Sequence, residues 1–444
     1  MELEALILKS AQQYNILPVT SRCNVQCIFC SHKNNPRGIK VVSCAYRPLE
    51  KVLEALDFLD PNQKIVIGES TTRIIEGEPF SHPDILEILK QVRGRFSTTP
   101  LYITTNGNNL TEKVVEQLAE LMPIELTISL NSSNIDIRRM IMGADGSGGI
   151  EAIALLQKFQ IPYHGSIVAM PWRTGWLDLE QTVKTLNHYG AQTVRIFLPG
   201  YTNKTEANLR FNSELWPALN RWIEGISGEI TTTLLLEPPL ITDLDARIKG
   251  VLANTAAQKS GFLPEDILLE VGGNPVNSRV DGFRLLEKAG TCTIKVARQG
   301  QEFSLKLDKK PGERSGIVVD FDVDLAHLQE VEYLLNSRRL SKGIILTSKL
   351  AEPLLKLGYA KLGLAERIAI YGVPSLYFGG SIKAAGLLVV EDFIQFLKAN
   401  SNMLGAGDLL ILPAVAFDSA GMDLVGRYYW ELEEYLQGKD VMIC

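Results

Sequence analysis

The stretch Cys23-Asn24-Val25-Gln26-Cys27-Ile28-Phe29-Cys30 places three cysteines within eight residues, in the spacing C-x3-C-x2-C. Four thiolates would suggest zinc or a closed iron–sulfur cluster, whereas three leave one iron of a cubane cluster without a protein ligand. The alternatives are three buried thiols on a loop, or a partial zinc site completed by His32. Because three thiols this close in sequence are difficult to bury without a metal, we expect a cluster held by Cys23, Cys27 and Cys30.

The length and composition of the chain limit its class. A chain of 444 residues is too long for one ordinary core and predicts two or three domains. The net charge of −6 gives no support to nucleic acid or an anionic membrane as a partner. No apolar run reaches the length of a membrane span, and residues 1–4 lack a basic secretory region, so we expect a cytoplasmic protein without a membrane partner. The other cysteines, Cys44, Cys292 and Cys444, are scattered, which is not the pattern of a disulfide framework.

Residues 1–237 alternate strand-like and helix-like runs. Strands are expected at 15–20, 64–68, 101–105, 125–131, 163–169 and 193–198. Helices are expected at 48–59, after a cap at Ser81, after a cap at Thr111, and at 149–159, 177–190 and 213–226. Six strand–helix repeats predict an all-parallel sheet, open or curled into a partial barrel.

Polar and glycine-rich residues follow these expected strands, where the chemistry of parallel sheets is found. The cysteines follow the first strand, Glu76-Gly77-Glu78-Pro79 follows the second, and Thr104-Thr105-Asn106-Gly107 follows the third. Ser129 and Asn131 end the fourth, and their alternate spacing predicts that they share one face. We expect these residues to form one site.

The first half of the chain resembles the core of radical S-adenosylmethionine (SAM) enzymes, an α/β fold built as a partial (β/α)6 barrel. The motif C-x3-C-x-Φ-C matches residues 23–30, with Phe29 at the aromatic position, and Gly77-Glu78-Pro79 resembles a G-G-E-P element in which Glu76 replaces the first glycine. The resemblance implies that the three cysteines hold a [4Fe–4S] cluster and that SAM binds its fourth iron. Cleavage of SAM would give a 5′-deoxyadenosyl radical that abstracts hydrogen from a substrate, with an electron donor such as flavodoxin or ferredoxin.

Seven residues are candidates for contacts to SAM: Phe29, Gly77, Glu78, Thr105, Asn106, Ser129 and Asn131. Glu78 would accept from the methionine ammonium, while Ser129 and Asn131 would bind the ribose. The alternative for Glu78 is a solvated acid on a loop, and the alternative for Thr105 and Asn106 is a turn at 105–107. Ser129 and Asn131 could instead be an ordinary strand end. Phe29 would either stack near the adenine or pack beneath the cluster.

Other polar residues and thiols have simpler interpretations. We expect Arg138 and Arg139 to lie on a solvated helix face, with pairing of one of them to the SAM carboxylate as the alternative. Arg195 would line the pocket. Cys44 is predicted to be a free buried thiol, and Cys444 a mobile terminal residue rather than a transfer thiol.

Residues 238–311 resemble a small, mostly-β PDZ domain of the bacterial type. The match rests on 254–267, 272–276 and 296–300. PDZ domains bind extended peptides by strand addition and hold the terminal carboxylate in a backbone nest. Here the loop at that position, 241–245, has no glycine and carries two acids that would repel a carboxylate. A docking or packing module is therefore an equal alternative to capture of a peptide terminus.

Residues 312–444 are expected to form a C-terminal α/β domain. Strands are expected at 316–320, 343–347, 367–371 and 408–412, and helices between them at 323–337, 348–362 and 383–399. The segment resembles the C-terminal domain of uncharacterised PDZ-containing iron–sulfur oxidoreductases, with Ser375–Gly379 in place of an Asn-x-Phe-Phe-Gly run. Candidates for a substrate surface are Tyr377, Phe378, Gly379, Gly380 and Asp418; the alternative is a turn with core aromatics.

The function that the sequence predicts is that of a radical SAM enzyme acting on an unidentified small molecule, peptide or protein. The alternative is a non-catalytic iron–sulfur scaffold or electron carrier that recruits partners through its PDZ-like module.

Overall fold

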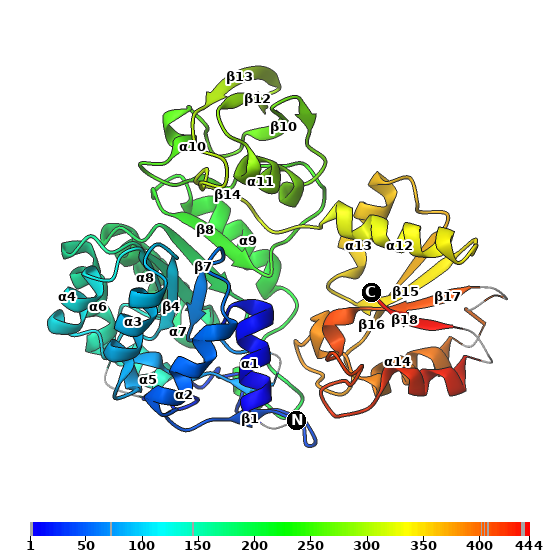
Figure 1. The fold of residues 1–444 in the computed structure, drawn as a ribbon, viewed down its shortest axis with the longest axis horizontal. Helices are drawn as coiled ribbons and strands as arrows, with labels where there is room; N and C mark the ends of the chain where they lie inside the picture. The colour runs from blue at the N-terminus through cyan, green and yellow to red at the C-terminus, as the bar shows by residue number, and fades with distance from the viewer. Residues whose placement is uncertain are drawn as a thin grey trace. The chain divides into compact units, whose positions relative to one another are not determined.

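The computed structural model describes residues 3–71, 73–143, 146–400, 402–403, 405, 408–436 and 440–444, and these divide into two compact units (Figure 1). Unit 1 contains Met1–Asn34, Lys40–Gly200 and Thr205–Pro238. Unit 2 contains Asn35–Ile39, Tyr201–Lys204 and Pro239–Cys444. Within the described ranges, no helix combines the length and the apolar character that a membrane span requires.

Unit 1 is built on a six-stranded parallel sheet. Its strand order is β2 (Ile65–Ile67), β4 (Leu101–Thr105), β5 (Ile124–Ser129), β6 (Tyr163–Val168), β7 (Thr193–Phe197) and β8 (Thr233–Glu237). Five of the six expected strands are confirmed. The expectation of a strand at 15–20 is wrong, because this segment makes one bridge, between Ile16 and Val66, and otherwise runs extended beside β2. The sixth strand is β8, which the sequence did not reveal.

The helices that connect these strands largely follow the expected pattern. Those expected are α2 (Leu49–Glu54) with η1 (Ala55–Phe58), α3 (Ile85–Arg95), α4 (Glu112–Ala119), α6 (Ser147–Lys158), α8 (Trp176–His188) and α9 (Leu215–Ile226). Thr111 caps α4 by accepting from the Val114 N–H, but Asp84 rather than Ser81 precedes α3. Elements that were not expected are α1 (Leu3–Tyr14), α5 (Ile135–Met142), α7 (Pro171–Thr174), and the paired short strands β1 (Val42–Ser43) and β3 (Ile74–Ile75).

The two faces of the sheet differ in chemistry. In β5 the alternate residues Ile124, Leu126 and Ile128 are buried in the main hydrophobic core, together with residues of α3, α4 and α6. Glu125, Thr127 and Ser129 point to the opposite face and are only half-buried. The second face of the sheet is therefore polar.

The first part of unit 2 contains a four-stranded antiparallel sheet. Its order is β11 (Asn274–Pro275), β10 (Ile267–Val271), β12 (Cys292–Arg298) and β13 (Gln301–Leu307), with helices α10 (Ala256–Lys259) and α11 (Arg279–Lys288). A separate strand pair joins β9 (Gly250–Val251) to β14 (Ile317–Val318). Ile317 belongs to the hydrophobic cluster that also contains buried residues of β10 and β12. This packing extends beyond the expected end at residue 311.

The last part of unit 2 is a second parallel sheet. Its order is β16 (Ile368–Val373), β15 (Gly343–Ser348), β17 (Leu409–Leu412) and β18 (Val441–Ile443). Helices α12 (Leu325–Ser337) and α13 (Glu352–Lys361) share one hydrophobic cluster with it, and α14 (Val390–Ala399) shares another. Figure 1 shows α12 and α13 on one side of this sheet and α14 on the other. Strand β18 was not expected.

The glycine-rich loop of this last part is a packing contact. Gly379 and Gly380 both have positive φ, and a Cβ on them would lie 1.9 Å from the Asn203 side chain and 2.2 Å from the Tyr201 carbonyl oxygen. Phe378 is buried. This arrangement fits a turn with core aromatics, and the role of these residues as a substrate surface stays a prediction.

Candidate functional site

The cysteine loop is held by α5. The N–H groups of Gln26 and Ile28 donate to the carbonyl oxygens of Met142 and Ile141, at 2.7 and 2.9 Å. Val25 packs with both of these helix residues in a small hydrophobic cluster. Because α5 ends at Met142, its last free carbonyls satisfy the backbone of the loop, which fixes the loop conformation between the cysteines.

Without a bound metal, the local environment disfavours the thiolate forms of Cys23 and Cys27. Cys23 is exposed, and Cys27 and Cys30 are half-buried. Burial, with a smaller effect of Cys23 and Cys30, raises the pKa of Cys27 to about 12. Burial also raises the pKa of Cys23. A bound cation reverses this cost, since a coordinating thiol is deprotonated by the metal.

A zinc ion and an iron–sulfur cluster require different spacings of the three thiols. Ligand sulfurs around one tetrahedral zinc lie about 3.8 Å apart, given Zn–S bonds of about 2.3 Å. Three thiolates on separate irons need a wider spacing. His32, the residue that would complete a partial zinc site, has its Nε2 3.4 Å from Ser70 Oγ.

The segment 76–78 runs against the residues that precede Cys23. The N–H of Gly77 donates to Thr20 O at 2.7 Å, and the N–H of Glu78 donates to Arg22 O at 2.8 Å. A Cβ on Gly77 would lie 2.0 Å from Arg22 O, so only glycine permits this approach. The close approach that Gly77 permits is therefore to the backbone of Arg22.

Glu76, which stands where the G-G-E-P element has its first glycine, is also part of this packing. Its Oε1 accepts from the N–H groups of Val19 and Thr20, at 3.0 and 3.3 Å. Its Oε2 has no hydrogen-bond partner. Burial raises the pKa of Glu76 to about 8, so this carboxyl group is largely protonated at neutral pH.

Glu78 connects the loop to the end of β4. Its Oε1 accepts from Thr105 Oγ1 at 2.6 Å and from the Phe80 N–H at 3.1 Å, and its Oε2 accepts from the Asn106 N–H at 2.7 Å. The side chain is buried, and burial raises its pKa although these hydrogen bonds oppose the change. A carboxylate has about four acceptor positions. One of the four therefore remains for a ligand cation.

Asn106 joins the end of β4 to the cysteine loop and to Arg138. Its Nδ2 donates to Asn24 Oδ1 at 2.7 Å, and its carbonyl oxygen accepts from Arg138 Nη2 at 2.7 Å. Thr105, Asn106, Glu78 and the cysteine loop thus come together as the sequence predicted.

Arg138 corrects a sequence-based expectation. We expected it on a solvated helix face, but its side chain is fully buried. Besides Asn106 O, it donates to Leu130 O, Gly146 O and Asn108 Oδ1. Burial lowers its pKa to about 10, whereas nearby Cys27 and Glu78 oppose this shift. The guanidinium therefore places a positive charge behind the cysteine loop.

Arg139 behaves as expected. It is exposed and pairs with Asp136 at 2.9 Å. Cys44 is a free, buried thiol with its Sγ 3.5 Å from Ser21 Oγ, which confirms that prediction.

Ser129 and Asn131 do not share a strand face. Strand β5 ends at Ser129, and Asn131 lies beyond it with a φ of 62°. Asn131 Oδ1 accepts from the Val168 N–H at 2.9 Å, and its Nδ2 donates to Ser129 O. The expectation of alternate spacing fails because the strand ends at Ser129, two residues earlier than predicted. Phe29 is half-buried and packs with Ile141 and Met142.

The polar face of the sheet brings Ser129 and Arg195 together with Glu125, His164 and Ser166, which the sequence analysis did not single out. The strand register aligns Ser129 with Ser166 and Ser166 with Arg195. His164 lies between its neighbours, with Nε2 3.6 Å from Glu125 Oε2 and Nδ1 2.8 Å from Thr193 Oγ1. The alternation of apolar and polar residues within 124–129 and 163–168 was the signal that could have identified them.

Arg195 lies on β7 and donates through Nε and Nη2 to Glu237 Oε1, at 3.0 and 2.9 Å. The pair bridges β7 and β8 and is partly exposed. The polar face therefore ends in a charged pair.

A cavity of about 360 Å³ lies in unit 1 near the carboxyl end of β6. Its lining includes Trp172 and Trp176, which follow β6, and Arg210 and Phe211, which precede α9. Aromatic walls with a few polar groups are typical of sites for organic ligands.

Comparison with known proteins identifies the first half of the chain. Residues 17–186 match the model of the radical SAM superfamily. These residues are a radical SAM domain. Members of this superfamily use a [4Fe–4S] cluster and SAM, which are the groups that the three thiols and their surroundings fit.

Three curated relatives match this radical SAM domain. The GTP 3′,8-cyclase of Lactiplantibacillus plantarum is 27% identical over 147 residues, 33% of this chain and 42% of the relative. The FeMo cofactor biosynthesis protein NifB of Chlorobaculum tepidum is 31% identical over 130 residues, 28% of this chain and 30% of the relative. The AdoMet-dependent heme synthase of Methanosarcina barkeri is 27% identical over 181 residues, 40% of this chain and 48% of the relative. The matches thus span less than half the length of these relatives.

Solved structures show a weaker likeness. Streptococcus suis SuiB bound to its precursor peptide SuiA is 15% identical, with a TM-score of 0.39, over 50% of this chain and 48% of SuiB. The protein anSMEcpe with bound AdoMet is 16% identical, with a TM-score of 0.38, over 49% of this chain and 62% of that protein.

Proposed function

We propose that this chain is a radical SAM enzyme with a polar substrate. The observation that carries the proposal is the cysteine loop, which α5, Glu78 and Asn106 hold in one place beside the carboxyl ends of the strands. When bound, the cluster and SAM would supply a carbon-centred radical that abstracts hydrogen from a substrate.

Within this proposal, Cys23, Cys27 and Cys30 are the cluster ligands. Gly77, Glu78, Thr105 and Asn106 form the wall nearest to them, and the remaining acceptor position of Glu78 is suited to an ammonium group. Phe29, Ser129 and Asn131 complete the proposed SAM contacts. The task of these residues is to orient the cofactor and to exclude water.

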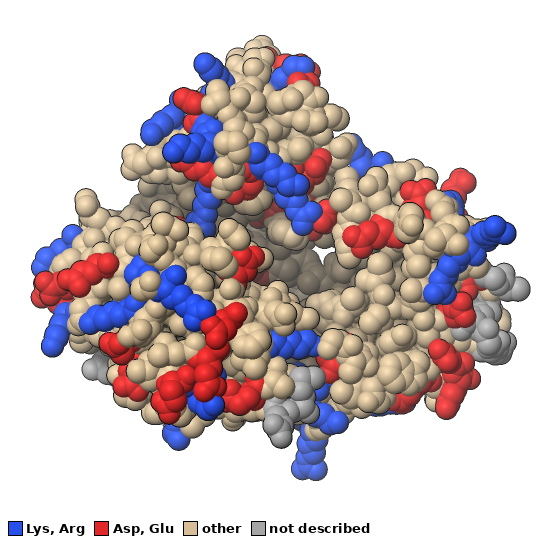
Figure 2. Space-filling model, in the orientation of Figure 1, with Lys and Arg blue, Asp and Glu red and all other residues tan. Residues whose placement is uncertain are grey.

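The substrate would lie against the polar face of the sheet. Glu125, His164, Ser166 and Arg195 line neighbouring strands there and offer both donors and acceptors. A small molecule or a peptide with several polar groups would satisfy them. On the face drawn in Figure 2, Lys and Arg are interspersed with Asp and Glu, with no continuous basic surface of the kind that nucleic acid requires.

We also propose three domains, a radical SAM core at 1–237, a PDZ-like domain at 238–311 and a C-terminal α/β domain at 312–444, with the strand Ile317–Val318 packing on the PDZ-like domain. The antiparallel sheet β11-β10-β12-β13 supports the second as a separate module. Reduced flavodoxin or ferredoxin would supply the electron. A cytoplasmic location suits the cysteines, all six of which are free.

The test is SAM cleavage. Protein with a reconstituted and reduced cluster should convert SAM to 5′-deoxyadenosine and methionine, and Cys27→Ala should abolish this without loss of the fold. Arg139→Ala, at an exposed site, is the matched control. A loaded cluster that yields no 5′-deoxyadenosine, with unchanged electron paramagnetic resonance on addition of SAM, would instead identify a non-catalytic scaffold or electron carrier.

A further inference from the structure

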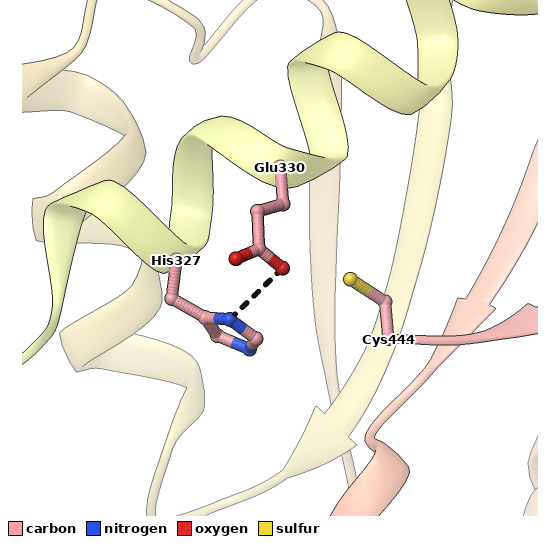
Figure 3. Close-up of side chains that lie close together, drawn as sticks. All are labelled: His327, Glu330 and Cys444. Carbon is pink, nitrogen blue, oxygen red and sulfur yellow. Dashed lines mark ion pairs between the residues drawn. The ribbon is translucent and has the colours of Figure 1, made fainter.

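Three side chains of different chemistry converge in unit 2, away from the cysteine loop. His327 and Glu330 lie one turn apart on α12, and Cys444 follows β18 (Figure 3). Their ligand atoms all lie within 4.8 Å of one another, and His327 Nδ1 is 3.2 Å from Glu330 Oε2. We propose that these residues form a site for a zinc-like divalent metal ion.

The donor set selects the class of ion. A thiolate, an imidazole and a carboxylate are the ligands of zinc and of its late first-row neighbours, whereas calcium and magnesium prefer oxygen alone. Ligands around one zinc lie about 3–4 Å apart, since zinc-to-ligand bonds are about 2.0–2.3 Å long. The imidazole and carboxylate already have this spacing, so small side-chain rotations complete the site.

Cys444 is held in position for this role. Its N–H donates to Leu412 O and its carbonyl oxygen accepts from the Ala414 N–H, both at 2.9 Å. Its side chain packs against the hydrophobic cluster of α12 and α13. A mobile terminal residue, as the sequence suggested, would show neither feature. The two ligands on α12 are fixed by the helix, so both halves of the site are pre-positioned.

The site has one open side. The side chains of His327 and Glu330 are 57% and 65% exposed, whereas Cys444 is half-buried. Three protein ligands with an exposed face leave a fourth position for water or another small ligand. Closed structural zinc sites have four protein ligands, so this geometry resembles that of exchangeable sites.

Cobalt(II) is the probe for this site, because cobalt bound to a thiolate gives a charge-transfer absorption band that zinc lacks. The competing thiols of the cluster loop are removed in full-length protein carrying Cys23→Ala, Cys27→Ala and Cys30→Ala. We expect one cobalt per chain with the thiolate band, and displacement by zinc, which binds more tightly.

Substitutions in this background locate the ion. Cys444→Ser should abolish the thiolate band, and His327→Ala should weaken binding by more than about 100-fold, since loss of an outer-sphere partner alone costs 10–100-fold. Cys292→Ser, at another half-buried thiol of unit 2, should change neither. Absence of the band, or its persistence in Cys444→Ser, would overturn the proposal.

A second measurement covers the case in which the triple variant does not fold. In wild-type protein with an intact iron–sulfur cluster, the loop thiols are occupied. After dialysis against zinc, we expect one zinc per chain, lost in Cys444→Ser and retained in Cys292→Ser. Zinc contents that are equal in these two variants would contradict the site. The result is independent of whether the protein cleaves SAM.

Discussion

Arg138 donates through Nη2 to the carbonyl oxygen of Asn106 at 2.7 Å, and both residues are buried beside the cysteine loop. The bond links the middle of α5 to the residue that follows β4. Since the same asparagine bonds to Asn24, the guanidinium supports the loop through one intermediate residue.

Replacing Arg138 with Met should destabilise unit 1. The change leaves the buried carbonyl groups of Asn106 and Gly146 without this donor, at about 1–3 kcal/mol each, so a loss of about 2 kcal/mol or more is expected. The measurement is the urea midpoint of the transition that involves unit 1, together with iron per chain after reconstitution. Arg139→Met should change stability by less than about 0.5 kcal/mol. Equal effects of the two substitutions would refute the supporting role of Arg138.

Gly77→Ala should displace the loop that precedes Cys23. A Cβ there would lie 2.0 Å from Arg22 O, and backbone on both sides must move. We expect more than about 2 kcal/mol of destabilisation and reduced cluster content. Gly94→Ala is the control, because nothing lies within 4 Å of its added Cβ and alanine favours a helix by about 1 kcal/mol. Full cluster loading in Gly77→Ala would show that the close approach is unimportant.

Glu76 should make unit 1 less stable as the pH rises. Its folded pKa of about 8 exceeds the ordinary value of 4.5, so between these values the folded state retains a proton that the unfolded state has released. The contribution is fully present below about pH 4.5 and is lost as the pH rises to about 8. Glu76→Gln removes this dependence. The free energy of unfolding of the variant, relative to that of wild type, should therefore rise by more than about 1.4 kcal/mol from pH 5 to pH 8. Parallel stability curves would show that the carboxyl titrates normally.

Glu78→Gln separates a structural role from a role in SAM binding. The amide cannot accept at both atoms, so at least one buried donor loses its acceptor, at about 1–3 kcal/mol. If Glu78 also binds the ammonium of SAM, the dissociation constant measured by equilibrium dialysis on cluster-loaded, folded protein should rise about 10-fold or more. Glu69→Gln, at an exposed acid, is the control. A destabilised variant with unchanged SAM affinity would limit Glu78 to packing.

The sequence predicted the elements whose pattern is local. Strands β4 to β7 combine β-branched residues with regular alternation, and α4 has a Thr111 cap, so each was recognisable without its neighbours. Strand β8 was missed because Thr-Leu-Leu-Leu-Glu shows weak alternation and leads directly into two prolines. The segment 15–20 has strand composition but lacks a continuous ladder.

The site was predictable where a motif fixes the spacing, and not where packing does. The cysteines, Glu78 and Asn106 come from motifs and lie together. Arg138 was misplaced because arginine is usually exposed, so no sequence pattern indicated that its helix face is buried. The group at His327, Glu330 and Cys444 joins residues more than 110 positions apart, which only the parallel pairing of β17 with β18 brings together.

The alternation in β5 and β6 also separates residues in the hydrophobic core from residues on the polar face of the sheet. Positions 124, 126 and 128 maintain the fold, and positions 125, 127 and 129 contribute little to it. Mutation can therefore sample new side chains at 125, 127, 129, 164 and 166 at low cost in stability. Such a sheet can acquire a different substrate through a few changes while the cysteine loop and its supports stay the same. If the proposed function holds, this is a structural route by which one such scaffold can diversify.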